Sequence, residues 1–397
     1  METENNPETL SNRLNAYLTG NKWTKLRCGR CDVQYYSKTD ERFCGDFSCQ
    51  GGYSFLQHKP KKNRTISEVT NDLEKHFCSN GYSKISPRDL VVHDSTTIFA
   101  TAGVQCVERM IKGEEPSRID SLLVFQPSFR TQTLDTLSAE TRDSCYAFVN
   151  VATIHLHPTF DEHLKHLDDW MSSLSRLGYY VGDFSLVPYS KTPDWGSGPF
   201  QKQGILFLFH GLELGVANFC YDITLGGVKG TLSDIGFGLE RLTWGLGKRD
   251  DIHDHLEVGE YSLIAPMQRY DLTRLMTLMS MSELKPGNRG PEYRFRQAAK
   301  IFVDNGFGYS VSEKEVRIAT DFWEKITGKN PSLGGIICEI NAELGRSFNL
   351  LLLRTLKIEP SSEMQKLHPE ELFRLLIQRG VSHRKLKEVL GGLHVRV

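Results

Sequence analysis

The segment 234–242 constrains the fold of this chain more than any other, because it combines glycines that permit a tight backbone turn with a charged side chain close by. It reads Asp-Ile-Gly-Phe-Gly-Leu-Glu-Arg-Leu. Gly236 and Gly238 allow the backbone to approach a ligand closely, and the helix that follows carries Arg241 at a fixed offset. A glycine-bearing strand end that passes into such a helix suits the base and phosphates of a nucleotide. The alternative is a turn whose glycines only relieve steric strain, with Arg241 in a surface ion pair.

The net charge and the lengths of the apolar runs limit the kinds of protein that this chain can be. The 397 residues contain Lys+Arg 48 against Asp+Glu 49, a net charge of −1. A protein that relies on a broad phosphate-backbone footprint is usually more basic. The longest apolar run falls short of the ~20 residues of a membrane span, and the first residues lack the features of a signal peptide. The nine cysteines fit reduced thiols better than a disulfide framework. We therefore expect a cytoplasmic protein without membrane contact.

Three regions follow one another along the chain. Residues 1–58 hold four of the nine cysteines and precede a basic linker. Residues 59–250 are rich in strand-like runs, whereas residues 251–397 are mainly helical in pattern. Within the central region the expected strands are 122–130, 145–152, 204–209 and 212–223, and the expected helices are 65–80 and 161–177. The first two strands flank a polar loop, which predicts an antiparallel hairpin.

The cysteines of the first region form two close pairs, in the pattern C-x2-C-x12-C-x4-C at Cys28, Cys31, Cys44 and Cys49. Zinc takes four soft ligands in a tetrahedron, and two such pairs supply them. The alternative is four unligated core thiols. A site with four protein ligands is closed, so we expect a structural Zn²⁺ in a zinc-ribbon-like segment.

Three further residues are candidates for binding. Arg130 ends a strand, where it can bind a carboxylate or phosphate bidentately, or lie on the surface. Phe148 on the returning strand can stack on a nucleobase, or pack in the core. Trp195, held in a Gly/Pro-rich loop, can form the wall of a pocket or anchor its own loop.

Four histidines lie close together in sequence: His155, His157, His163 and His166. Side chains of this kind bind metals. Neither pair has a carboxylate at a clear ligand offset, and Pro158 separates the pairs. Structural or surface histidines are therefore the favoured interpretation.

Taken in order, these pieces resemble motifs two and three of class II aminoacyl-tRNA synthetases, and most closely the catalytic domain of archaeal-type alanyl-tRNA synthetase. The runs 234–241 and 126–130 (Gln-Pro-Ser-Phe-Arg) are similar to that family's Asp-Thr-Gly-x-Gly-Leu-Glu-Arg and Gln-Pro-Cys-Ile-Arg. The runs 101–105 and 195–199 resemble its motif-one stretch and its tryptophan loop. The resemblance implies an α+β fold, with a class II synthetase-like antiparallel sheet flanked by helices, an N-terminal zinc-ribbon-like segment and a C-terminal helical region.

The resemblance also implies a nucleotide site that binds ATP and Mg²⁺. Arg130 would clamp the α-phosphate and the amino-acid carboxylate. Phe148 and Arg241 would enclose adenine, and Glu213 would lie near the ribose or Mg²⁺. Gly236 and Gly238 would bring the backbone against the nucleotide. Arg130 and Arg241 are thus the expected catalytic pair.

The amino-acid side of the expected site contains four residues, namely Trp195, Asp234, Asn150 and Val216. Asp234 would bind the α-ammonium group, and Trp195 would wall the side chain. Asn150 and Val216 depart from the family, which has methionine and Thr or Asn there. Val149 replaces a glutamate, which implies the loss of an active-site carboxylate, and Ile235 replaces a threonine.

The implied function is that of an aminoacyl-adenylate-forming ligase for alanine or a similarly small amino acid. The family's separate editing domain has no counterpart in the 397 residues, so we expect a stand-alone enzyme that passes the acyl group to a small molecule or a carrier protein. Two alternatives are a truncated alanyl-tRNA synthetase that charges tRNA and a non-catalytic synthetase-like regulatory or binding protein.

Overall fold

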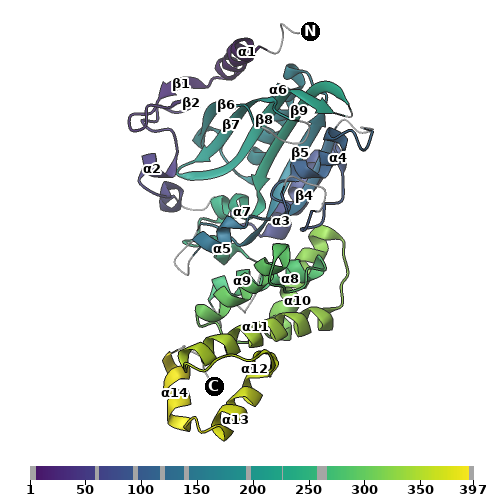
Figure 1. The fold of residues 1–397 in the computed structure, drawn as a ribbon. Helices are drawn as coiled ribbons and strands as arrows, with labels where there is room; N and C mark the ends of the chain where they lie inside the picture. Colours follow the sequence, from purple (N-terminus) through teal and green to yellow (C-terminus); the bar gives the residue numbers. More distant parts are fainter. Residues whose placement is uncertain are drawn as a thin grey trace.

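The computed structural model describes residues 6–58, 62–92, 97–116, 121–137, 143–193, 198–225, 227–256 and 266–392. Its centre is a nine-stranded sheet with the order β1-β2-β6-β7-β8-β9-β5-β4-β3 (Figure 1). The strands are β1 (Thr24–Arg27), β2 (Gln34–Ser37), β3 (Ser83–Lys84), β4 (Ser121–Phe129), β5 (Ala147–Leu156), β6 (Phe184–Lys191), β7 (Gln201–Phe209), β8 (Leu212–Leu225) and β9 (Val228–Gly238).

Neighbouring described strands run antiparallel except at the edge, where β3 pairs parallel with β4. The hairpin expected from the two apolar runs is β4–β5, in register from Ser121 opposite His155 to Phe129 opposite Ala147. The predicted α+β fold with an antiparallel sheet flanked by helices is therefore confirmed.

The first region joins this sheet, because β2 pairs with β6 through Tyr36 and Ser37. It also contains α1 (Pro7–Gly20), α2 (Phe47–Gln50) and the short helix η1 (Ser54–Gln57). The cysteine-bearing segment therefore extends the edge of the central sheet.

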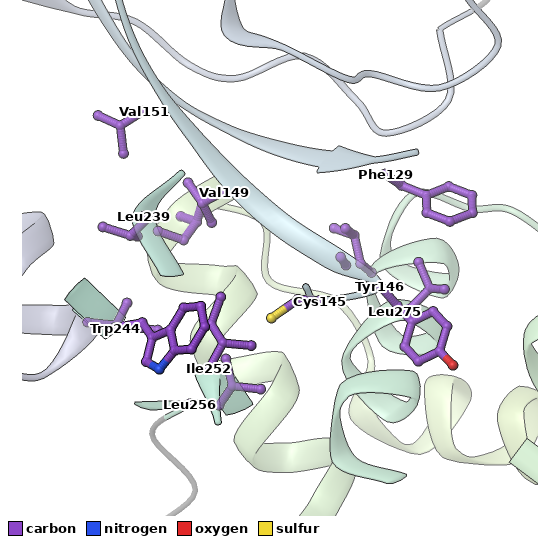
Figure 2. Packing of buried hydrophobic residues seen from close by; sticks show 14 of the residues in the cluster. Phe129, Cys145, Tyr146, Val149, Val151, Leu239, Trp244, Ile252, Leu256 and Leu275 are labelled. Atoms are coloured by element: carbon purple, nitrogen blue, oxygen red, sulfur yellow. The ribbon is translucent and has the colours of Figure 1, made fainter. Parts of the chain in front are cut away.

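Three helices cover one face of the sheet: α3 (Ile66–Ser79), α6 (Phe160–Leu177) and α7 (Leu239–Gly247). Thr65 and Glu68 form a capping box at the start of α3, the helix expected at 65–80. Trp170 of α6 stacks on Phe237 of β9 at 4.2 Å between ring centroids. Figure 2 shows the part of this core where Val149 and Trp244 pack near Cys145 and Ile252.

The opposite face carries shorter elements, η2 (Gly103–Val107) and α4 (Glu108–Ile111), over a smaller apolar cluster. A Cβ atom on Gly103 would lie 2.3 Å from the Cβ atom of Ala152 on β5, so glycine is needed for this close approach. Asn150 Oδ1 also accepts a hydrogen bond from the Gly103 N–H at 2.7 Å. Together these contacts fasten η2 to the sheet beside the cavity described below.

The helical region gathers at one end of the sheet, away from the N-terminus (Figure 1). The remaining described helices are α5 (Gln132–Thr136), η3 (Val181–Asp183), η4 (Ile252–His255), α8 (Met267–Met281), α9 (Gly290–Asp304), α10 (Glu313–Thr327), α11 (Leu333–Thr355), α12 (Ser362–Lys366), α13 (Pro369–Gln378) and α14 (His383–Gly392). Among the described helices, none is long and apolar enough to cross a membrane.

Candidate active site

The ends of β4, β5, β8 and β9 and the first turn of α7 surround one cavity. It is lined by Arg130, Thr133, Ser144, Cys145, Phe148, Asn150, Glu213, Leu214, Gly215, Val216, Gly236, Gly238, Glu240, Arg241 and Ile252. The structure therefore brings together all the residues expected to bind the nucleotide, and two of the four expected on the amino-acid side.

Strand pairing explains how distant residues meet here. Asn150 on β5 lies opposite Gly238 on β9, and Val216 on β8 lies opposite Gly236. Because successive side chains of a strand point to opposite faces, residues 148 and 150 share a face with residues 236 and 238. This is the sheet face on which η2 packs.

Two arginines converge on the cavity. The guanidinium of Arg130 lies 5.2 Å from the centre of the Phe148 ring, and Arg241 Nη1 donates to the Glu213 carbonyl oxygen at 3.0 Å. Partial burial and the positive charge of Arg241 lower the pKa of Arg130, while the carboxylate of Glu213 opposes this shift. Mutual repulsion of two guanidinium groups is relieved by an anion between them, so the cavity is suited to a phosphate.

Asp234 lies further along the same face of β9, two residues from Gly236. Its carboxylate accepts a hydrogen bond from Asn218 Nδ2 at 3.3 Å, and Asn218 Oδ1 accepts one from Tyr189 Oη at 2.6 Å. Burial raises the pKa of Asp234 to about 6, and the Asn218 hydrogen bond and the charge of Lys202 oppose the shift. Two residues of strand span roughly 7 Å, so Asp234 adjoins the cavity without lining it.

Sequence reasoning missed Tyr189 and Asn218. Gly204, on the strand between them, is the one available signal. A Cβ atom at Gly204 would meet the Tyr189 ring at 2.3 Å, so the glycine makes room for the ring to lie against the sheet. Tyr189, Asn218 and Asp234 therefore form a hydrogen-bonded row on the same sheet face as the cavity.

The structure corrects the interpretation of Val149. We expected the loss of a glutamate there to remove an active-site carboxylate. Instead, Val149 is fully buried on the opposite face, in the core between the sheet and the helices (Figure 2). Ile235 is likewise fully buried on that face. The expectation failed because strand alternation places residues 149 and 235 away from the cavity. Trp195 lies outside the described residues.

A buried charge network, which the sequence did not predict, lies directly behind the cavity. Arg274 of α8 donates to Glu240 Oε1 at 2.9 Å and lies 3.3 Å from Asp271 Oδ1. The other oxygens of these carboxylates accept from the backbone N–H groups of Val149 at 3.0 Å and Tyr146 at 2.6 Å. The network thus joins the helical region to β5 and to the helix that carries Arg241.

The four predicted cysteine ligands meet in space. Their Sγ atoms all lie within 4.8 Å of one another, and Cys31 Sγ is 3.7 Å from Cys44 Sγ. Zn–S bonds of about 2.3 Å in a tetrahedron place sulfurs about 3.8 Å apart, so this arrangement fits zinc. Cys28, Cys44 and Cys49 are buried, and Cys31 is exposed. The four residues therefore form a group capable of holding one metal ion.

Three of the four histidines, His155, His163 and His166, lie on the helix-covered face, away from the cavity, whereas His157 is exposed just past the end of β5. His163 Nδ1 and His166 Nδ1 both lie within hydrogen-bond distance of Ser233 Oγ, at 2.6 and 2.8 Å. The rings of His155 and His166 stack at 4.1 Å. Burial lowers the pKa of His163 to about 3 and that of His166 in the same direction, with the charge of His155 adding to both shifts. These two histidines are therefore neutral, contact Ser233 through hydrogen bonds, and contribute to the packing of α6 against the sheet.

Comparisons with known proteins address the resemblance directly. No family model matches the chain. Alanine–tRNA ligase from Korarchaeum cryptofilum is 23% identical over 321 residues, covering 76% of this chain and 34% of that protein. The alanine–tRNA ligase from Methanococcoides burtonii is 24% identical over 408 residues, covering 90% and 42%. That from Methanosarcina acetivorans is 25% identical over 270 residues, covering 61% and 28%.

The chain therefore spans between 28% and 42% of the length of these three relatives. Among solved structures, pyrrolysyl-tRNA synthetase from Desulfitobacterium hafniense matches with a TM-score of 0.36 and 14% identity, covering 51% of this chain and 75% of that chain. The resemblance to archaeal alanine–tRNA ligases that the motifs predict is confirmed by sequence matches at 23–25% identity.

Proposed function

We propose that this chain activates alanine or a similarly small amino acid with ATP, forming an aminoacyl-adenylate. The observation that carries the proposal is the single cavity in which Arg130, Arg241 and Phe148 meet the glycine-bearing end of β9. The similarity to proteins named alanine–tRNA ligase supports the same reaction class.

In this proposal, the position of each residue around the cavity determines its role in the reaction. The amino-acid carboxylate attacks the α-phosphorus of ATP, a P–O bond forms, and pyrophosphate leaves. Arg130 and Arg241 neutralise the charge that builds up on the phosphoryl oxygens, while Phe148 and Arg241 enclose the base. Asp234 binds the α-ammonium group, with Asn150 and Val216 beside the amino-acid side chain. Such a reaction needs positioning and charge neutralisation more than proton transfer.

Metal ions complete the proposal. Glu213, one of the two glutamates that line the cavity, would hold a Mg²⁺ that neutralises the triphosphate. The four cysteines would hold a structural Zn²⁺ that fastens the first region against the edge of the sheet.

For the second half-reaction we propose a small molecule or the thiol of a carrier protein as acceptor. The net charge of −1 supports this, because extended contact with a tRNA backbone favours a basic surface.

A tRNA acceptor is the second candidate, and one feature favours it. A second cavity lies past the end of β4, lined in part by Gln132, Arg289, Tyr293 and Arg294. Two guanidinium groups and an exposed aromatic ring suit the phosphates and bases of a single-stranded RNA end.

ATP–pyrophosphate exchange with a panel of amino acids tests the first step. We expect exchange with one or a few small amino acids, strongly reduced in Arg130→Ala and unchanged in Arg317→Ala, which alters an exposed ion pair on α10. Absence of exchange with any amino acid, together with absence of ATP binding, would identify a non-catalytic binding protein. Exchange accompanied by charging of total tRNA would select the tRNA acceptor.

A further inference from the structure

A second group of metal-ligating side chains lies behind the cavity, apart from the cysteine quartet. Cys145 precedes β5, His253 lies in η4, and Asp271 lies in α8. The thiol sulfur, an imidazole nitrogen and a carboxylate oxygen lie within 4.8 Å of one another. All three residues are buried, with exposed fractions of 5%, 1% and 0%. Three segments far apart in the sequence therefore direct three different ligand types at one point.

The orientation of His253 is the observation that points to a ligand. Its Nδ1 donates to Asp251 Oδ1 at 2.6 Å, which fixes the ring. Its Nε2 is buried and lacks a hydrogen-bond partner among the described residues, and Asp271 Oδ2 lies 3.4 Å away. Metal-binding histidines characteristically donate one ring nitrogen to a carboxylate while the other faces the ion. His253 has the orientation of such a ligand, with Nδ1 on Asp251 and Nε2 directed toward the Asp271 carboxylate.

Contacts within the protein also fix the orientation of the Asp271 carboxylate. Its Oδ2 accepts from the Tyr146 N–H at 2.6 Å, and its Oδ1 lies 3.3 Å from Arg274 Nη1. A carboxylate with these contacts keeps lone pairs for an ion on its remaining side. An ion would displace the proton of His253, and the carboxylates of Asp251, Asp271 and Glu240 would then face one remaining cation among these residues, the guanidinium of Arg274.

We propose that Cys145, His253 and Asp271 bind a divalent metal of the zinc type. Sulfur, imidazole nitrogen and carboxylate oxygen together match the ligand preference of Zn²⁺ and disfavour Mg²⁺ or Ca²⁺. Cys145 also lines the proposed nucleotide cavity. Three protein ligands would leave the fourth coordination position of such an ion to a water molecule or a bound substrate. The ion would join β5, η4 and α8 at the back of the cavity.

Metal analysis of the purified full chain tests the proposal. We expect two equivalents of zinc per chain, one in the cysteine quartet and one here, and a single equivalent in Cys145→Ser. Cys220→Ser is the matched control, because Cys220 is equally buried but belongs to no group of potential ligands among the described residues. It should retain two equivalents. One equivalent in the wild type, or two in Cys145→Ser, would overturn the proposal.

A second measurement covers the case in which Cys145→Ser fails to fold. The double variant Cys28→Ser/Cys44→Ser disrupts the quartet and leaves Cys145 intact. We expect it to take up one equivalent of Co²⁺ with a sulfur-to-cobalt absorption band, and uptake of no Co²⁺ by a folded chain would refute the site. These readouts are independent of amino-acid activation, so failure here is distinguishable from failure of the proposed function.

Discussion

Replacing Arg274 with methionine is the sharpest test of how the helical region supports the cavity. The Arg274 side chain is 1% exposed, and it bridges the carboxylates of Glu240 and Asp271. Its guanidinium also lies over the rings of Phe322 and Trp323, at 4.6 and 5.1 Å. Methionine conserves much of the volume but leaves two buried carboxylates without their counter-charge. Removing one partner of a buried pair costs about 3–5 kcal/mol, so we expect that loss in the free energy of unfolding.

The sign of the pH dependence follows from the same contacts. Burial raises the pKa of Glu240, and the charge of Arg274 opposes that shift. Without Arg274, the folded state holds the Glu240 proton more tightly than the unfolded state does. The stability lost in Arg274→Met should therefore be smallest near pH 4 and grow as the pH rises toward 8.

Urea unfolding followed by circular dichroism measures this effect. Arg317→Met is the matched control, because Arg317 pairs with Glu313 at 2.5 Å on an exposed surface. That pair should contribute less than about 1 kcal/mol. Combining Arg274→Met with Glu240→Gln removes one stranded charge, so the double variant should be less destabilised than the sum of the single variants. Equal unfolding midpoints for Arg274→Met and Arg317→Met, or strict additivity in the double variant, would refute the reasoning.

Further outcomes follow from the other parts of the molecule. Arg130→Ala and Arg241→Ala should each lower ATP–pyrophosphate exchange by at least ~100-fold without unfolding the chain, and near-normal exchange would mean that the site is misplaced. The KM for the amino acid should fall as the pH rises through about 6, because the ionised carboxylate of Asp234 binds the ammonium group; Asp234→Asn should raise that KM and abolish its pH dependence. Cys28→Ser should lower the zinc content by one equivalent and reduce Tm, and unchanged metal content would contradict a quartet site. The unfolded state takes up a proton at His163 below pH ~6.5 and the folded state only near pH 3. As the pH is lowered through this range, the free energy of unfolding should therefore fall by up to about 1.4 kcal/mol per pH unit. A urea midpoint that stays constant between pH 7 and pH 5 would contradict a neutral buried histidine.

Local sequence patterns predicted the elements well, because local physics sets them. The helix expected at 65–80 is α3, and the capping box of Thr65 and Glu68 marks its start. The apolar runs on either side of a polar loop became the β4–β5 hairpin. Hydrogen-bonding at a helix end and alternation along a strand depend on residues a few positions apart.

Local sequence patterns could not predict on which face of the sheet a side chain lies, or which residues it meets on the neighbouring strands. Val149 is adjacent to Phe148 in sequence, yet it packs in the core, because its side chain points to the other face of β5. Asn218 pairs with Asp234 only because β8 and β9 align in that register. Motif resemblance names positions along a strand, whereas the register and the alternation decide which of them reach the cavity.

By itself, the sequence determined the chemistry available to this protein: two arginines, an aromatic ring, a glycine-bearing strand end and two cysteine pairs at fixed spacings. Only the tertiary structure decided that the residues proposed to bind the nucleotide share one cavity, that His163 and His166 are packing groups, and that Arg274 meets Glu240 behind that cavity. The physical reason is that a buried charge or polar group is stable only with partners, and those partners come from elements distant in the chain. Their meeting depends on the packing of the whole sheet and its helices.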